Sequence, residues 1–474
     1  MNRLLLISLI FCLGITTGRA QSAVYDTVPC PAALVSIATE NHLEGVAYTC
    51  GVLKVPENRH TPSSRQIELA VSRLQPTPPT DQPPIIYLAG GPGGSALGDI
   101  ALWLDSALLA QHEIILLEQR GTAFSWPSLM CPELSNTAFR PVAACAQRLR
   151  DEGVDLAAYN TSENAADVAD LIHVLGLASV NLIGQSYGTR LALAVLRDHP
   201  ERVHAVILDA VYPTHASVYE GRLAAAQRAL DALFADCAAD AACNASYPDL
   251  EATFYRLLSR LDSSPQLITL SNYGAQFYYN DDYLIQDMMN WLYITDEVPL
   301  LPGRIMAFFD GDFSYYNDLI LEQTATPISM GLYFSVQCQE EIPVDDIESV
   351  LRGDGRSRFE VSDPLRRILR EQFASCLDWD VPTAAAYTRA PVTSDRPVLL
   401  MSGRYDPITS PEWAQQAAGT LTNSQHVIFQ NGAHGVINQL DCADRIAAAF
   451  FLAPFQAVEA GCASQAPEWV LANP

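Results

Sequence analysis

The sequence predicts an α/β fold: a mostly parallel sheet flanked by helices, with a large and mainly helical insertion. Short apolar runs alternate with helical segments in the first half of the chain. From residue 213 this rhythm stops, and the pattern is helical without visible strands. The alternation then returns near the C-terminus. We therefore expect a core formed by residues 21–212 and 391–474, with residues 213–390 inserted as a cap.

The first twenty residues have the pattern of a secretory signal peptide. Asn2 and Arg3 precede an apolar run that ends at small residues around Arg19, and the run is too short to favour a membrane span. We expect cleavage near Ala20, export to a periplasm or the medium, and no membrane partner.

Charge and cysteine content indicate which partners and which kinds of site to expect. The chain has 28 basic and 54 acidic residues, a net charge of -26, which disfavours binding to nucleic acid. Without Cys12 of the signal, an even number of cysteines remains, as expected for disulfides in an exported protein. Crossed pairings stay open, but the spacing favours disulfides between neighbouring cysteines. These pairs are Cys30 with Cys50, Cys131 with Cys145, Cys237 with Cys243, Cys338 with Cys376, and Cys442 with Cys462. We expect neither a metal site nor a cofactor, since no Cys-x-x-Cys pair occurs and the histidines are scattered.

The N-terminal part of the predicted sheet contains four strands. Residues 46–56 and 67–74 read as an antiparallel pair, and two buried runs follow at 85–89 and 114–117. A glycine-rich loop, GGPGGS, comes directly after the third strand. We interpret Glu118 and Arg120, after the fourth strand, as residues that pin loops.

The central motif is a sharp turn between a strand and a helix. Residues 161–175 have the spacing of a crossover helix, residues 180–184 form an apolar strand, and residues 189–200 read as a helix. Between them lies GQSYG, in which the glycines on either side of Ser186 leave room for a tight turn. This pattern predicts a nucleophile elbow that presents the Ser186 hydroxyl.

A serine nucleophile needs a base and an acid that orients the base. Another strand is expected at residues 203–211. Near the C-terminus, Asp406 ends the strand in PVLLMSGRYDP, His434 follows the strand in HVIFQNGAHG, and a helix at 444–455 closes the chain. Asp395 and Asp441 are rivals for the acid, but neither lies at the end of a strand. The order Ser186, Asp406, His434 is that of an α/β-hydrolase.

The reaction also needs two donors for an oxyanion. We expect the amide of Tyr187, directly after the nucleophile, to be one donor. The other is expected from Gly90 or Gly91 in the glycine-rich loop.

Taken in order, the motifs GGPGGS, EQRGT, GQSYGTRLAL, SGRYDP and GAHG resemble the secreted tripeptidyl aminopeptidases of the prolyl-aminopeptidase-like serine peptidases. The resemblance covers nearly the whole mature chain. It implies an α/β-hydrolase fold, a helical cap, and release of short N-terminal pieces from peptides with a free N-terminus. Ala89 stands where prolyl aminopeptidases usually carry a histidine, which favours the tripeptidyl branch; Ala123 stands where a glycine often follows RGT.

An aminopeptidase must bind a free ammonium group, which calls for carboxylates. The segment VQCQEEIP carries Glu340 and Glu341 next to Cys338. Similar Cys-x-Glu segments occur in the caps of this family, so Glu340 is the expected anchor and Glu341 its neighbour. The competing interpretation is a solvated acidic pair.

Two other functions stay open from the sequence alone. An esterase of the same fold would use the same triad and oxyanion hole. A binding protein that lost its chemistry is less consistent with the sequence, because nucleophile, acid, base and oxyanion donors are all present.

Overall fold

The computed structural model describes residues 22–38, 44–134, 142–270, 275–316 and 327–471. The expected signal peptide and its cleavage point at Ala20 lie outside these residues. None of the helices in the described ranges is long and apolar enough to cross a membrane.

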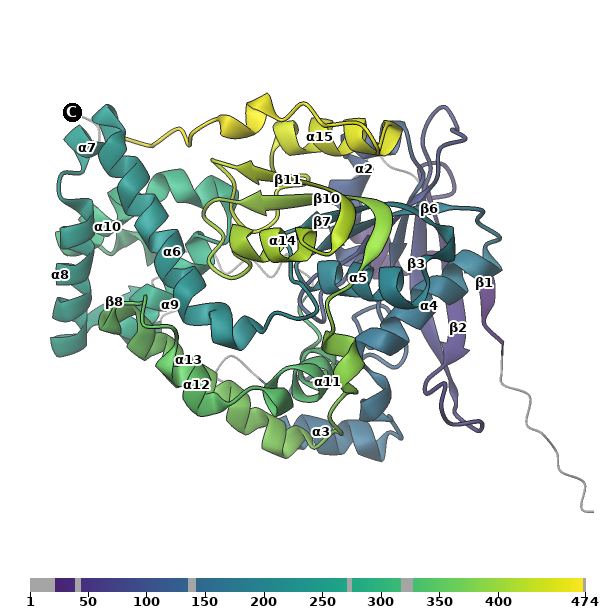
Figure 1. Ribbon diagram of the computed structural model, residues 1–474. Helices are drawn as coiled ribbons and strands as arrows, with labels where there is room; N and C mark the ends of the chain where they lie inside the picture. Colours follow the sequence, from purple (N-terminus) through teal and green to yellow (C-terminus); the bar gives the residue numbers. More distant parts are fainter. Residues whose placement is uncertain (1–21, 39–43, 135–141, 271–274, 317–326, 472–474) are drawn as a thin grey trace, which may run out of the picture.

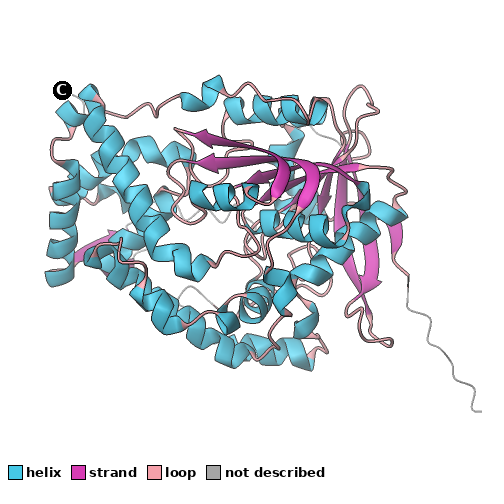
Figure 2. Ribbon diagram, viewed as in Figure 1, coloured by secondary structure: helices cyan, strands magenta, loops and turns pink. Residues whose placement is uncertain are grey.

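A nine-stranded sheet forms the centre of the molecule, in the order β1-β2-β3-β5-β4-β6-β7-β10-β11. The pairs β1–β2, β2–β3 and β3–β5 are antiparallel, and every later pair is parallel (Figure 2). This confirms the predicted fold class. The strands are β1 (Val24–Val28), β2 (Tyr48–Pro56), β3 (Gln66–Leu74), β4 (Ile85–Leu88), β5 (Ile114–Leu117), β6 (Val180–Gln185), β7 (Val203–Asp209), β10 (Ser394–Gly403) and β11 (Leu421–Phe429).

Helices cover both faces of this sheet because its parallel strands are apolar on both sides. One face packs against α1 (Ala32–Ile37), α2 (Ile100–Leu104) and α15 (Asp441–Leu452). The other packs against α4 (Thr161–Val174), α5 (Tyr187–Asp198) and α14 (Pro411–Ala418). Figure 1 shows α5 and α14 running beside the parallel strands. The carboxyl ends of β6, β7, β10 and β11 therefore meet along one edge.

The segment between β7 and β10 is mainly helical and has its own apolar core. In Figure 1 its helices form an arc beside the sheet. The segment also holds one antiparallel pair that the sequence pattern did not indicate, β8 (Gln266–Leu270) with β9 (Ala275–Tyr279). Its helices are α6 (Val218–Ala239), α7 (Ala241–Ser246), α8 (Leu250–Ser263), α9 (Asp281–Trp291), α10 (Leu301–Phe309), α11 (Met330–Glu340), α12 (Ile347–Arg352) and α13 (Phe359–Trp379).

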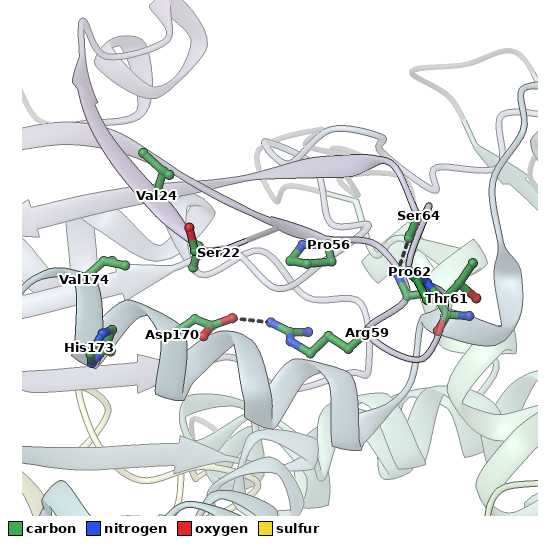
Figure 3. Close-up of a pocket in the computed structure, with 12 residues that line it drawn as sticks. Ser22, Val24, Pro56, Arg59, Thr61, Pro62, Ser64, Asp170, His173 and Val174 are labelled. Atoms are coloured by element: carbon green, nitrogen blue, oxygen red, sulfur yellow. Dashed lines mark hydrogen bonds and ion pairs between the residues drawn. The ribbon is translucent and has the colours of Figure 1, made fainter. Parts of the chain in front are cut away.

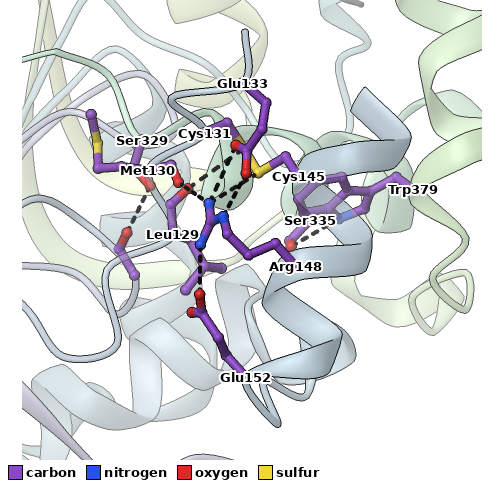
Figure 4. Close-up of a disulfide and its surroundings, with 11 residues drawn as sticks. Leu129, Met130, Cys131, Glu133, Cys145, Arg148, Glu152, Ser329, Ser335 and Trp379 are labelled. Carbon is purple, nitrogen blue, oxygen red and sulfur yellow. Dashed lines mark hydrogen bonds and ion pairs between the residues drawn. A yellow bond between two sulfur atoms is a disulfide. The ribbon is translucent and has the colours of Figure 1, made fainter. Parts of the chain in front are cut away.

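The five neighbour pairings of cysteines are confirmed as disulfides. The bridge from Cys131 to Cys145 ties the loop after β5 to α3 (Val142–Asp151). Arg148 of the same helix donates to Glu133 and to the carbonyl of Met130 (Figure 4). The bridge from Cys338 in α11 to Cys376 in α13 joins two helices of the insertion.

Candidate active site

Ser186 lies in the turn between β6 and α5 with φ 56° and ψ −123°, a conformation that non-glycine residues rarely adopt. A Cβ atom on Gly184 would lie 2.2 Å from the carbonyl oxygen of Gly188. A Cβ atom on Gly188 would lie 1.9 Å from the carbonyl oxygen of Leu88. Both glycines are therefore required by the close approach of β4, β6 and α5. The Ser186 hydroxyl makes no hydrogen bond that caps the helix.

His434 and Asp406 come together because they follow adjacent parallel strands, β11 and β10. Nδ1 of His434 lies 2.8 Å from Oδ2 of Asp406. Nε2 of His434 is buried and has no hydrogen-bond partner in the part of the chain that the structure describes. An imidazole that donates from Nδ1 to a carboxylate presents Nε2 as a proton acceptor.

Hydrogen bonds hold Asp406 in its charged form. The amides of Ile408 and Thr409 each donate to Oδ1 at 2.8 Å, and the Thr409 hydroxyl donates to Oδ2 at 2.5 Å. Burial opposes ionisation, but the electrostatic attraction to His434 and these bonds outweigh it, so the pKa of Asp406 lies below its ordinary value. Thr409, whose Oγ1 is also 3.1 Å from Nδ1 of His434, was not anticipated from the sequence.

The expected oxyanion donors lie on two sides of the nucleophile. Tyr187 is the first residue of α5, directly after Ser186. A Cβ atom on Gly90 would lie 3.0 Å from Cβ of Ser186, so the glycine-rich loop passes very close to the elbow. Gly91 has φ +113°, which strains any other residue. The structure thus places Gly90 and Tyr187 beside Ser186.

Residues on neighbouring segments hold the glycine-rich loop in place. The amide of Ser329 donates to the carbonyl of Gly93 at 2.8 Å, and its hydroxyl donates to the carbonyl of Gly121 at 2.7 Å. Glu118 accepts the hydroxyls of Ser95 and Thr122. Burial raises the pKa of Glu118 to about 7, although its hydrogen bonds oppose this. Glu118 thus pins this loop, as its sequence position indicates.

Arg120 is a structural residue as well. Its guanidinium donates to both carboxylate oxygens of Asp167 in α4 at 2.8 Å and to the carbonyl of Ala158 at 2.7 Å. The segment after β5 is therefore fixed against α4.

Glu340 and Glu341 lie at the end of α11 and are buried. Glu340 accepts the amide and the hydroxyl of Thr161, both at 2.7 Å. Glu341 forms an ion pair with Arg190 of α5 at 2.7 Å. Among the described residues, however, no donor forms a hydrogen bond of good geometry with either of its carboxylate oxygens. Burial raises the pKa of Glu341 to about 7, against the opposing effect of Arg190. Within the described ranges, no hydrogen bond or ion pair joins either carboxylate to Ser186, Asp406 or His434.

A hollow lies away from these residues. It measures about 790 Å³ and lies between β1, the loop after β2 and the end of α4 (Figure 3). Its one guanidinium, Arg59, is bound by Asp170, Asp167 and Glu163, so the hollow offers no free cation. Among the described residues, the one group at metal-binding spacing contains Cys131 and Cys145, whose sulfur atoms form a disulfide.

Comparison with known proteins agrees with the fold described above. A family model described as the alpha/beta hydrolase fold matches residues 83–437. The chain is 24% identical to serine protease Hip1 of Mycobacterium tuberculosis (strain ATCC 25618 / H37Rv), over 94% of this chain and 93% of that protein. It is 29% identical to a tripeptidyl aminopeptidase of Streptomyces lividans, over 34% of this chain and 35% of that protein. It is 26% identical to a proline iminopeptidase of Neisseria gonorrhoeae, over 28% of this chain and 34% of that protein.

Proposed function

The chain belongs to the alpha/beta-hydrolase fold family, and from this premise we propose that it is an exported serine exopeptidase. In this proposal it releases short N-terminal units, in particular tripeptides, from peptides with a free N-terminus. Residues 213–390 act as the cap over the site. The peptidase assignment is supported by relatives that are named as a serine protease, a tripeptidyl aminopeptidase and a proline iminopeptidase. Five disulfides support export to an oxidising compartment.

The observation that carries the proposal is the 2.8 Å contact between His434 and Asp406 beside the strained elbow. In the proposed reaction, Nε2 of His434 takes the proton from Ser186 as its oxygen attacks the peptide carbonyl. The amide of Tyr187 and one amide from Gly90 or Gly91 bind the oxyanion. His434 then protonates the leaving amine, and water hydrolyses the acyl-enzyme with the same histidine as base.

Charge supports a role of the two glutamates in binding the ammonium group. Glu340, Glu341 and Arg190 together carry one net negative charge when ionised, which matches one ammonium. Thr161 already occupies both oxygens of Glu340. Because the oxygens of Glu341 keep unused acceptor capacity, we assign the contact with the ammonium to Glu341, with Glu340 as its negatively charged neighbour.

Product analysis tests the proposal. The secreted protein and a Ser186→Ala variant are incubated with a peptide library, and products are identified by mass spectrometry. We expect release of N-terminal tripeptides by the wild type alone, and little release from acetylated peptides. Internal cleavage, or equal cleavage of acetylated peptides, would contradict the exopeptidase assignment. Faster hydrolysis of p-nitrophenyl butyrate than of free tripeptide p-nitroanilides would instead favour the esterase alternative.

A further inference from the structure

A turn of the insertion contacts the proposed base directly. Tyr293 follows α9, and its ring stacks on the imidazole of His434 with centroids 4.0 Å apart and planes at 23°. The amide of His434 also donates to the carbonyl of Tyr293 at 3.2 Å. Two residues on, the hydroxyl of Thr295 accepts the amide of Ala433 at 3.2 Å. The turn therefore holds both the ring and the backbone of the base.

Tyr293 is not an ordinary core residue. As a whole residue it is 37% exposed, whereas His434 is 9% exposed, so the tyrosine covers the imidazole. Burial and the neighbouring charge of Asp406 raise the pKa of Tyr293, while interaction with Ser186 opposes the shift. The tyrosine thus lies near Ser186 while its ring stacks on His434.

The stack supplies a constraint that Asp406 and Thr409 do not. Both of these residues contact the same ring atom, Nδ1 of His434, at 2.8 and 3.1 Å. Contacts at one atom leave the ring free to tilt about that atom. A parallel aromatic ring restricts the tilt and keeps Nε2 directed toward its reaction partner. Once Nε2 is protonated, the ring of Tyr293 also faces a cation, which aromatic faces stabilise.

We propose that Tyr293 is a positioning residue for the reaction: the insertion, through this stack, holds His434 in the orientation that activates Ser186. The inference rests on the proposed function, since it requires His434 to act as the base. It makes the insertion part of the catalytic apparatus as well as a cover for the substrate.

Four variants test the inference: Tyr293→Ala, Tyr293→Phe, Thr295→Val and, as a control, Tyr283→Ala. Tyr283 is also a partly exposed tyrosine of the insertion and stacks on Tyr279, away from the triad. The measurements are kcat and KM with a free tripeptide p-nitroanilide, and the rate at which a fluorophosphonate labels Ser186. Phenylalanine keeps the stack and removes only the hydroxyl.

We expect Tyr293→Ala to lower kcat by about 3-fold to 30-fold and to slow labelling similarly, with KM nearly unchanged. Tyr293→Phe should restore most of the rate, Thr295→Val should give a smaller loss, and Tyr283→Ala should match the wild type. Wild-type rates in Tyr293→Ala would overturn the inference, and so would a Tyr293→Phe variant as slow as the alanine variant. If Tyr293→Ala does not fold, Tyr293→Leu replaces it, because leucine fills space without a stacking face. Failure of the wild type to label at Ser186 would instead refute the proposed function.

Discussion

The backbone carbonyl of Asp209 accepts the amide of Ser186 at 2.8 Å, while its carboxylate accepts the amides of Val436 and Ile437 at 2.8 and 3.0 Å. One buried residue at the end of β7 thus joins the elbow to the loop that follows His434. Burial raises the pKa of Asp209 to about 6, although the two amides oppose the shift. Ser186 and the loop that carries His434 are therefore fixed to the same point of the sheet.

Replacing Asp209 should damage this link. Both amides donate to Oδ2, and only the amide of Val436 also reaches Oδ1, at 3.1 Å. In Asp209→Asn an NH2 group replaces one of these oxygens and meets a backbone N–H, donor against donor, which costs about 1–3 kcal/mol. We expect the free energy of unfolding in urea to fall by that amount and kcat to fall more than KM rises. Asp99→Asn is the matched control, because Asp99 is a carboxylate nearby whose pKa burial also raises to about 6. An unchanged kcat in Asp209→Asn would contradict this role.

Gly90 should tolerate no side chain. A methyl group there would lie 3.0 Å from Cβ of Ser186 and would displace the glycine-rich loop. Since loss of one oxyanion donor typically lowers turnover by about 100-fold to 1000-fold, we expect Gly90→Ala to lower kcat toward that range with a small change in KM. Gly461→Ala serves as control, because its methyl group would contact nothing within 4 Å. Full activity of Gly90→Ala would argue against this loop as a donor.

The buried Glu118 predicts how stability depends on pH. Its folded pKa of about 7 lies above the ordinary 4.5, so the folded state binds the proton more tightly than the unfolded state. The contribution of Glu118 to stability therefore falls as pH rises from about 4.5 to 7. Relative to Glu118→Gln, the wild type should lose about 3 kcal/mol of unfolding free energy across this range. Urea unfolding at several pH values measures it, with Glu251→Gln on the surface as control. A constant difference between wild type and Glu118→Gln would refute the prediction.

Recognition of the substrate amine should weaken in acid. Below pH 7, Glu341 gains a proton, and the cluster with Glu340 and Arg190 loses its net negative charge. We expect the ratio of kcat/KM for free over acetylated tripeptide substrates to fall as pH drops through about 7. Glu341→Gln should lower the ratio about 10-fold to 100-fold at pH 7.5 and remove this pH dependence.

The matched variant for that experiment is Glu340→Gln. It should mainly disturb the hydrogen bonds with Thr161, and it should lower the ratio of kcat/KM for free over acetylated substrates less than Glu341→Gln does. If both variants discriminate free from acetylated substrates as well as the wild type does, neither glutamate binds the amine. If Glu340→Gln alone loses discrimination, Glu340 is the anchor instead.

The fold and the triad candidates could be predicted from the sequence because their signals are local. Ser186 lies between a strand and a helix with glycines on both sides, and Asp406 and His434 each follow an apolar strand. The order of these elements along the chain then determines which side chains share an edge of the sheet.

Contacts between distant segments could not be predicted in this way. Tyr293 lies far from His434 in the sequence, and nothing in its neighbourhood distinguishes it from other aromatic residues of the insertion. The sequence segments that form β1 and the β8–β9 pair are short and mostly exposed, so they lack a clear apolar pattern. Asp209 is different: its position at the end of an apolar strand was a signal that could have identified it.

The central claim is that Ser186 is a nucleophile activated by His434. The most direct test is to treat the wild type and a His434→Ala variant with a fluorophosphonate and to map the modified peptide by mass spectrometry. We expect a single adduct on Ser186 in the wild type and little or no adduct in the variant. An adduct on another residue, or equal labelling of Ser186 without His434, would contradict it.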